Sequence, residues 1–209
     1  EGLGLGFVCV SPGELALVRR MSPQLPPERV LYTPNFASEA EYQAGFTHGA
    51  TVTLDNPEPL DSWPQVFQGR EVFLRLDLGR GAGHHRHVRT AGTRSKFGIP
   101  LEKIGALRER LAALDIRVAG LHSHSGSGIR TPESWACAAA SLAEVARDFP
   151  NVRVLDLGGG LGVPERPGEL NFDLHALGQQ LAAFRSSQPG FQIWLEPGRH
   201  LVAQAGILL

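Results

Sequence analysis

The stretch that decides the fold runs from residue 118 to residue 160 and reads VAGLHSHSGSGIRTPESWACAAASLAEVARDFPNVRVLDLGGG. It begins with a short apolar run, passes through a Gly-rich turn into a longer segment with apolar residues at helical spacing, and ends in a second short apolar run. Two strands joined by a helix form a crossover that places them parallel in one sheet. This stretch therefore predicts an α/β fold with a parallel sheet.

The same alternation extends along the whole chain. The expected strands are rich in Val, Ile and Leu, and they are Phe7–Val10, Val30–Thr33, Thr51–Leu54, Val72–Asp77, Val118–His124, Val154–Gly158 and Ile193–Glu196. A first helix is expected to begin at the capping sequence Ser11-Pro12-Gly13-Glu14. Four more helices are expected over Ser38–Ala44, Leu101–Leu114, Pro132–Asp148 and Phe172–Ser186. About seven βα units are one fewer than a closed eight-stranded barrel has. We therefore expect one domain over residues 1–209, a partial parallel (β/α)8 barrel that lacks its first strand and is incomplete at both ends.

Composition narrows the classes of partner and location. The chain has 209 residues, enough for one domain with a sizeable core, and its 20 basic and 21 acidic residues nearly balance. No apolar run approaches the roughly 20 residues of a transmembrane helix, and only two cysteines occur. We expect a cytoplasmic protein that binds a small molecule, with neither nucleic acid nor a membrane as partner.

The first of three unusual strand ends is Gly120-Leu121-His122-Ser123-His124-Ser125-Gly126-Ser127-Gly128. Active sites of parallel barrels lie at the carboxyl ends of the strands. His122 and His124 share one face because side chains alternate along a strand, and the turn offers backbone N–H groups and the Ser127 hydroxyl to an anion. A ring-stacking histidine on a flat ligand, a zinc-type metal site and a pair of structural histidines all fit this motif alone.

The second strand end is Leu155-Asp156-Leu157-Gly158-Gly159-Gly160-Leu161-Gly162, and the third is Leu195-Glu196-Pro197-Gly198-Arg199. Consecutive glycines permit the close backbone approach that cradles a phosphate. A carboxylate such as Glu196 can keep a pyridine nitrogen protonated, which makes the ring an electron sink for decarboxylation. Arg199 can bind a phosphate or carboxylate through two hydrogen bonds; a surface salt bridge is the alternative reading of this third motif.

The three motifs, in this order and at these distances, resemble those of pyridoxal 5′-phosphate (PLP) decarboxylases with the alanine-racemase-like fold. The resemblance is greatest to the diaminopimelate decarboxylases. It extends to Cys9-Val10-Ser11-Pro12-Gly13-Glu14-Leu15 and to Ser95-Lys96-Phe97-Gly98, and so covers nearly the whole chain. The His-rich stretch of residues 84–92 is similar to the decarboxylase half of aspartate kinase–diaminopimelate decarboxylase fusions.

The resemblance implies a role for each matching residue. His124 stacks on the cofactor ring and Glu196 pairs with the pyridinium nitrogen, and these two are the expected catalytic residues. The expected cofactor contacts are His124, Ser127, Gly158, Gly159, Gly160, Glu196, Pro197, Gly198 and Arg199. Arg199 and Arg75 are expected to bind the substrate, and no metal is expected.

The resemblance also implies that parts of the enzyme lie outside this chain. The family's Schiff-base lysine lies on the first barrel strand, which should precede Glu1, and a β domain follows the barrel; we therefore expect this chain alone to be inactive. In a full-length homodimer the expected reaction is decarboxylation of meso-diaminopimelate to L-lysine, the last step of lysine biosynthesis. The alternatives are an ornithine, arginine or carboxynorspermidine decarboxylase, a non-catalytic PLP-binding protein, and a metal-dependent barrel hydrolase using His122 and His124.

Overall fold

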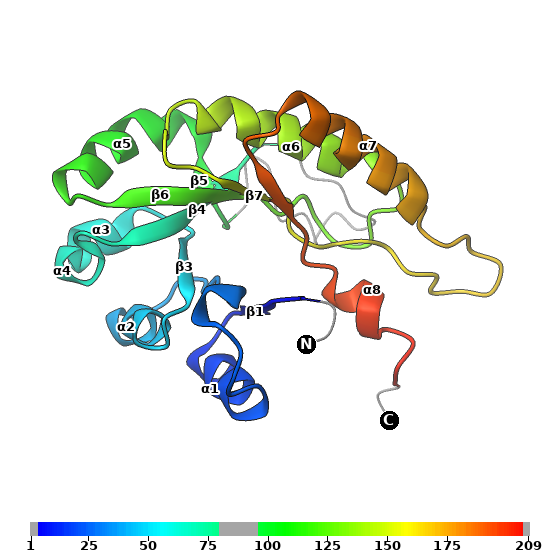
Figure 1. Ribbon diagram of the computed structural model, residues 1–209, viewed down its shortest axis with the longest axis horizontal. Coiled ribbons are helices and arrows are strands. Elements are labelled where there is room, and N and C mark those ends of the chain that lie inside the picture. Colours follow the sequence, from blue (N-terminus) through cyan, green and yellow to red (C-terminus); the bar gives the residue numbers. More distant parts are fainter. Residues whose placement is uncertain (1–3, 80–95, 207–209) are drawn as a thin grey trace. The chain divides into compact units, whose positions relative to one another are not determined.

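A computed structural model describes residues 4–79 and 96–206. They fall into two compact units: unit 1 is Glu1–Leu76 with Phe97–Ala119, and unit 2 is Asp77–Lys96 with Gly120–Leu209. Figure 1 shows the elements of both units in the colours of the sequence. The His-rich stretch of residues 84–92, which suggests the fusion enzymes, lies outside the described residues.

Unit 1 is built on parallel strands that follow one another in chain order. Its strands β1 (Phe7–Cys9), β2 (Val30–Tyr32), β3 (Thr51–Leu54) and β4 (Glu71–Asp77) pair in this order, each parallel to the next. A two-residue strand, β5 (Ile99–Pro100), pairs with β4. The N–H of Arg117, the first residue of β6 (Arg117–His122), donates to the carbonyl of Arg70, just before β4.

The helices of unit 1 are α1 (Pro12–Met21), α2 (Glu39–Thr47), α3 (Glu58–Ser62), α4 (Pro64–Phe67) and α5 (Ile104–Ala113), with short 3₁₀ turns at Pro27–Arg29 and Leu101–Lys103. The first two of these helices are capped at their starts: Ser11 accepts the N–H of Glu14, and Ser38 forms a reciprocal capping box with Glu41. Tyr42 of α2 is buried edge-on against Phe67, with 5.1 Å between the ring centres.

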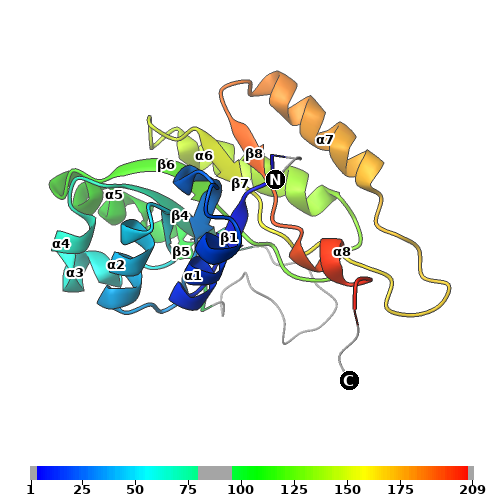
Figure 2. The same cartoon turned by 60° about the horizontal axis from the view of Figure 1, so that its bottom comes forward.

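Unit 2 contains the remaining strands and the longest helices. The end of β6, β7 (Val154–Asp156) and β8 (Gln192–Trp194) pair in parallel, with His122 opposite Asp156 and Asp156 opposite Trp194. Helices α6 (Glu133–Ala146) and α7 (Leu174–Ser187) lie side by side over one face of β7 and β8, and α8 (Gly198–Val202) follows β8 (Figures 1 and 2). Trp135 of α6 is completely buried and meets Phe172 edge-on.

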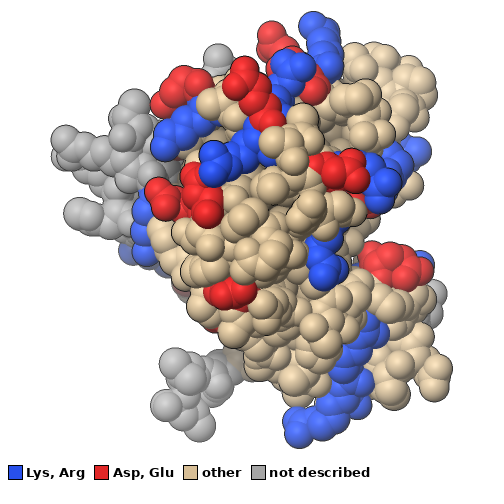
Figure 3. Space-filling view, turned by 90° about the vertical axis from the view of Figure 1, so that its left-hand side faces the viewer, with Lys and Arg blue, Asp and Glu red and all other residues tan. Residues whose placement is uncertain are grey.

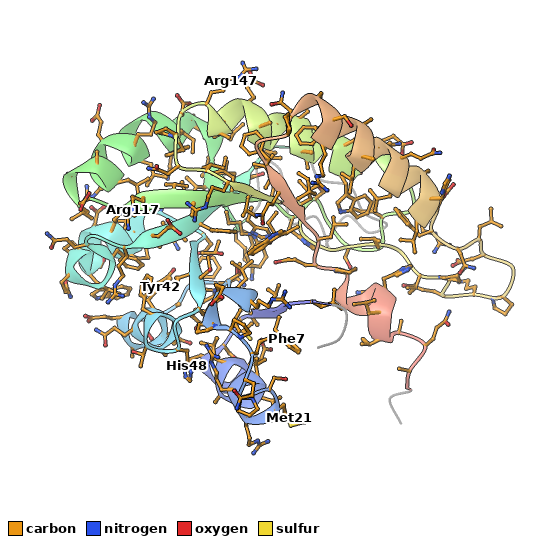
Figure 4. All side chains as sticks on the ribbon, viewed as in Figure 1. Phe7, Met21, Tyr42, His48, Arg117 and Arg147 are labelled. Carbon is orange, nitrogen blue, oxygen red and sulfur yellow. The ribbon has the colours of Figure 1, made fainter. Side chains whose placement is uncertain are left out.

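The surface of the protein carries charged side chains of both signs. The face drawn in Figure 3 carries acidic and basic side chains interspersed with one another. Met21, at the end of α1, and Arg147, just after α6, point away from the strands (Figure 4). No helix among residues 4–79 and 96–206 has both the length and the apolar character needed to cross a membrane.

All seven expected strands form, and each is followed by a helix, so the prediction of about seven parallel βα units is confirmed. The differences concern short elements. Helices α3, α4 and α8 and strand β5 were not predicted, because four or five residues are too few to show a helical period and two are too few to show alternation. Helix α2 continues to Thr47, beyond the predicted end at Ala44.

Candidate active site

Three polar side chains, two of them buried and one half-buried, meet at the carboxyl ends of the strands of unit 2. His122 ends β6 and Asp156 ends β7, and the two are paired across the sheet. Glu196 lies two residues beyond Trp194, the partner of Asp156 on β8, and alternation therefore returns it to the same face. One nitrogen or oxygen atom from each of the three side chains lies within 4.8 Å of such an atom of the other two. We call this set the His122–Asp156–Glu196 cluster.

The cluster is strongly shielded from water. Asp156 is 0% exposed, and its Oδ1 accepts the N–H of Gly158 at 2.9 Å. Burial, followed by the negative charge of Glu196, raises the pKa of Asp156 to about 7, although His122 opposes this rise. His122 Nε2 lies 3.6 Å from Glu196 Oε2, and neither ring nitrogen of His122 has a hydrogen-bond partner among the described residues.

The three consecutive glycines bring the backbones of neighbouring strand ends into contact. A Cβ on Gly158 would lie 2.8 Å from Nδ1 of His124, and on Gly160 it would lie 2.0 Å from the carbonyl oxygen of Gly126. A Cβ on Gly159 would lie 2.1 Å from the carbonyl oxygen of Glu196. The glycine run is thus required by the protein's own packing. Close approach of a phosphate is a second possible use of the same run.

His124 is held in a defined orientation beside this run. Its Nδ1 accepts the N–H of Gly159 at 3.3 Å, which leaves Nε2 to carry the ring proton in the neutral form. Ser127 is half-buried close to Gly160, and no described residue bonds its hydroxyl. His124, Ser127, Gly158–Gly160 and Glu196 are therefore brought together, as the motifs predict.

The segment Glu196-Pro197-Gly198-Arg199 forms the remaining side of the candidate site. Pro197 precedes α8, and Gly198 begins it with no atom within 4 Å of where its Cβ would be. Arg199 has a 55% exposed side chain whose Nη1 lies 3.6 Å from Oε1 of Glu165. An exposed ion pair of this length is weak, so the guanidinium can exchange Glu165 for another anion.

This donor set fits a flat, phosphorylated ring with a basic nitrogen. Glu196 offers a carboxylate whose side chain is 16% exposed, and His124 offers an imidazole held by the backbone. Ser127 offers a hydroxyl without a partner in the described parts of the chain, and Arg199 offers an exposed guanidinium. These are the groups that PLP requires for its nitrogen, ring and phosphate.

Arg75 lies in unit 1, two residues before the end of β4. Its guanidinium donates to Oδ1 of Asn35 at 2.9 Å and lies 4.8 Å above the ring of Phe97. Asp55, buried at the end of β3, has its pKa raised by desolvation, against which its hydrogen bond with Asn56 and the charge of Arg75 both act. The place of Arg75 in the same site as Glu196 stays a prediction.

The residues that motif reasoning missed are Asp156, Asn35 and Asp55. Asp156 stands in the quoted Leu-Asp-Leu-Gly-Gly-Gly motif, where a single acid within an apolar run was the available signal. Asp55 directly follows an apolar strand in the same way, and Asn35 lies three residues after β2. Active sites of parallel barrels lie at the carboxyl ends of the strands, so a polar residue at such an end is a candidate site residue.

Residues 1–203 match the family model described as the pyridoxal binding domain of pyridoxal-dependent decarboxylases. The chain belongs to this family. Among curated relatives of this decarboxylase domain, the diaminopimelate decarboxylase of Deinococcus radiodurans is 34% identical over 99% of the chain and 51% of its own length. That of Methanothermobacter thermautotrophicus is 30% identical over 100% of the chain and 51% of its own length.

Solved structures agree with the fold of this decarboxylase domain. A diaminopimelate decarboxylase superposes with a TM-score of 0.83 at 26% identity, over 97% of the chain and 50% of that protein. The arginine decarboxylase of Paramecium bursaria Chlorella virus gives a TM-score of 0.75 at 26% identity, over 94% of the chain and 52% of that protein. The expected class, a partial parallel (β/α)8 barrel, is confirmed. The chain spans about half the length of the relatives that it matches.

Proposed function

We propose that the protein carrying this chain is a PLP-dependent decarboxylase that converts meso-diaminopimelate to L-lysine. The observation that carries the proposal is Glu196, a carboxylate held at a strand end beside His124 and the glycine run. Family membership supports the cofactor, and the curated relatives named diaminopimelate decarboxylase support the substrate.

Apart from Glu196, the residues of the chain perform three tasks in this proposal. His124, fixed by the Gly159 N–H, would hold the face of the cofactor ring. Ser127, Gly158, Gly160, Gly198 and Arg199 would hold the phosphate, with Pro197 setting the turn that presents the last two. Arg75, preorganised by Asn35 and Phe97, would bind a substrate carboxylate.

Glu196 would hold a proton on the ring nitrogen by direct charge pairing. When bound, PLP supplies an electron sink for the electron pair left behind as the substrate loses CO2. The Glu196 carboxylate would interact most strongly when charge has developed in the transition state, and only such differential interactions raise kcat. Burial of the groups around Glu196 strengthens this effect, because water screens them less.

We further propose that the full-length protein is a cytoplasmic homodimer. The resemblance to this decarboxylase family, which implies a dimer with shared sites, supports this assignment. Measuring the molar mass of the full-length protein in solution tests it. A mass of two chains is expected, and a monomer with full decarboxylase activity would contradict it.

The variant Glu196→Gln tests the proposed role of Glu196, because it removes the charge and keeps the shape. We expect PLP to remain bound through the phosphate contacts, and kcat to fall by roughly 10²-fold, as is usual when a preorganised charge-stabilising group is lost. Cofactor absorbance and steady-state decarboxylation should be measured on the same preparations. Glu144→Gln, at an exposed position of α6, is the matched control. Full occupancy together with near-normal kcat in Glu196→Gln would refute the assignment.

A further inference from the structure

Two members of the His122–Asp156–Glu196 cluster have no task in the mechanism above. Asp156 and His122 are both almost completely buried, yet each carries a titratable group, and both lie against Glu196. Burying such groups is costly unless they are hydrogen-bonded or share a proton. Their position against Glu196 therefore calls for a physical explanation beyond packing.

The burial of Asp156 and its closeness to Glu196 indicate that the two carboxyl groups share one proton below about pH 7. Oxygen atoms of the two side chains lie within 4.8 Å of each other, and a hydrogen bond between the side chains is one cause of the raised pKa of Asp156. If both were ionised, Asp156 Oδ2 would have no donor among the described residues, and two like charges would face each other away from water. One proton between the two carboxyl groups removes both difficulties.

The environment places that proton on Asp156. Asp156 is fully buried, whereas the side chain of Glu196 retains 16% exposure, so desolvation disfavours the charged form of Asp156 more strongly. Among the described residues, the titratable groups that face Asp156 are His122 from β6 and Glu196 from the segment after β8. In the same part of the chain, the N–H of Gly158 is the one group of its own strand end that donates to Asp156, at Oδ1. Oδ2 is therefore the oxygen left to carry the proton toward Glu196.

We propose that Asp156 is a positioning residue that acts in its neutral form, donating a hydrogen bond from Oδ2 that holds Glu196 as an ionised carboxylate. His122, with Nε2 3.6 Å from Glu196 Oε2, confines the same carboxylate from the β6 side. The consequence for the proposed function, on which this inference rests, is that Glu196 meets the ring nitrogen with a full negative charge and a fixed orientation.

Two substitutions at Asp156 separate this role from the alternatives. Asp156→Asn keeps an oxygen for the Gly158 N–H and gains an N–H donor toward Glu196, and its orientation is set because its nitrogen cannot accept from Gly158. Asn is thus a permanent copy of the neutral acid. Asp156→Ala removes the donor altogether. If Asp156 acted as a negative charge instead, Asn would be as harmful as Ala.

The full-length protein without added PLP provides a first readout that does not depend on activity. Infrared difference spectra against Asp156→Asn should show the C=O stretch of a protonated carboxyl group in the wild type. That band should disappear as the pH is raised through about 7, where the pKa of Asp156 lies. Asp148→Asn, at an exposed position after α6, serves as the control and should leave the band unchanged. Absence of the band in wild type at pH 6 would overturn the proposal.

The second readout uses PLP labelled with ¹⁵N at its ring nitrogen, together with kcat. Wild type and Asp156→Asn should both show the chemical shift of a protonated ring nitrogen and should agree in kcat within about threefold. Asp156→Ala should lose roughly 10- to 100-fold in kcat, the range for losing one hydrogen bond to a charged group. Equal losses in Asn and Ala would overturn the proposal, as would stoichiometric divalent metal bound at the cluster in the purified protein.

Failure of the proposed function gives a different pattern from failure of this inference. A fully active Glu196→Gln would remove the ring-nitrogen role, while the infrared band would still report where the proton of the cluster lies. Should Asp156→Ala fail to fold, Asp156→Asn still decides the matter, because its activity and the missing band are measured against wild type alone.

Discussion

Replacing Gly159 by alanine tests whether the glycine run fixes Glu196 by contact. The added Cβ would lie 2.1 Å from the carbonyl oxygen of Glu196, and Cβ atoms do not approach closer than 3.0 Å, so the Glu196 backbone must move by about 0.9 Å. That movement strains the hydrogen bond from Glu196 N–H to the Gly158 carbonyl, now 3.0 Å. Overpacking costs about 1–3 kcal/mol, and loss of one buried hydrogen bond adds about 1–3 kcal/mol. We expect Gly159→Ala to lower the free energy of unfolding by roughly 2–6 kcal/mol.

The activity of the same variant should fall further than its stability suggests. A displacement near 1 Å of a catalytic group can cost about 10²-fold in rate. Urea unfolding followed by fluorescence and steady-state decarboxylation should be compared with Gly178→Ala, an exposed position inside α7 with no atom within 4 Å of its Cβ site. The control should be stabilised by about 0.5–1 kcal/mol, because Ala favours the helix over Gly. Gly159→Ala with unchanged stability and unchanged kcat would refute the packing account of the site.

Two further predictions concern stability. The pKa of Asp156 is about 7 in the folded protein, which exceeds the value of about 4 expected in the unfolded chain. Between these two pH values the folded protein holds a proton that the unfolded chain has lost. The contribution of Asp156 to stability is therefore lost as the pH rises from about 4 to about 7. Relative to wild type, Asp156→Asn should gain up to about 1.4 kcal/mol per pH unit across that window, measured by urea unfolding at several pH values; parallel pH profiles would contradict this. Trp135→Ala should cost about 3–5 kcal/mol in the same assay, because it empties a fully buried site against Phe172. A loss below about 1 kcal/mol would contradict the close packing of Trp135 in the core.

The strands could be predicted because each is a short apolar run between turn residues, and strands of a parallel sheet covered by helices are apolar throughout. Runs such as Val30–Thr33 and Val154–Gly158 therefore gave positions within two residues of β2 and β7. The helix after Pro197 could not be predicted in this way, since its five residues carry no period. Local pattern thus predicts the long elements and misses the short connecting ones.

The site was predictable in part. The pairing of His124 with the glycine run follows from two motifs at strand ends, which meet in a parallel barrel. The role of Asp156 could not be read in advance, because its meaning depends on the register that sets it opposite His122 and level with Trp194. Similarly, no sequence motif indicates that Arg199 pairs with Glu165, a residue of an irregular connection.

The formation of CO2 and L-lysine from meso-diaminopimelate is the measurement that tests the central claim most directly. The full-length protein should be freed of PLP, then assayed with and without added PLP, while both products are quantified. We predict equal molar amounts of CO2 and L-lysine, formed only when PLP is bound. Full PLP occupancy without release of CO2 from meso-diaminopimelate would contradict the account.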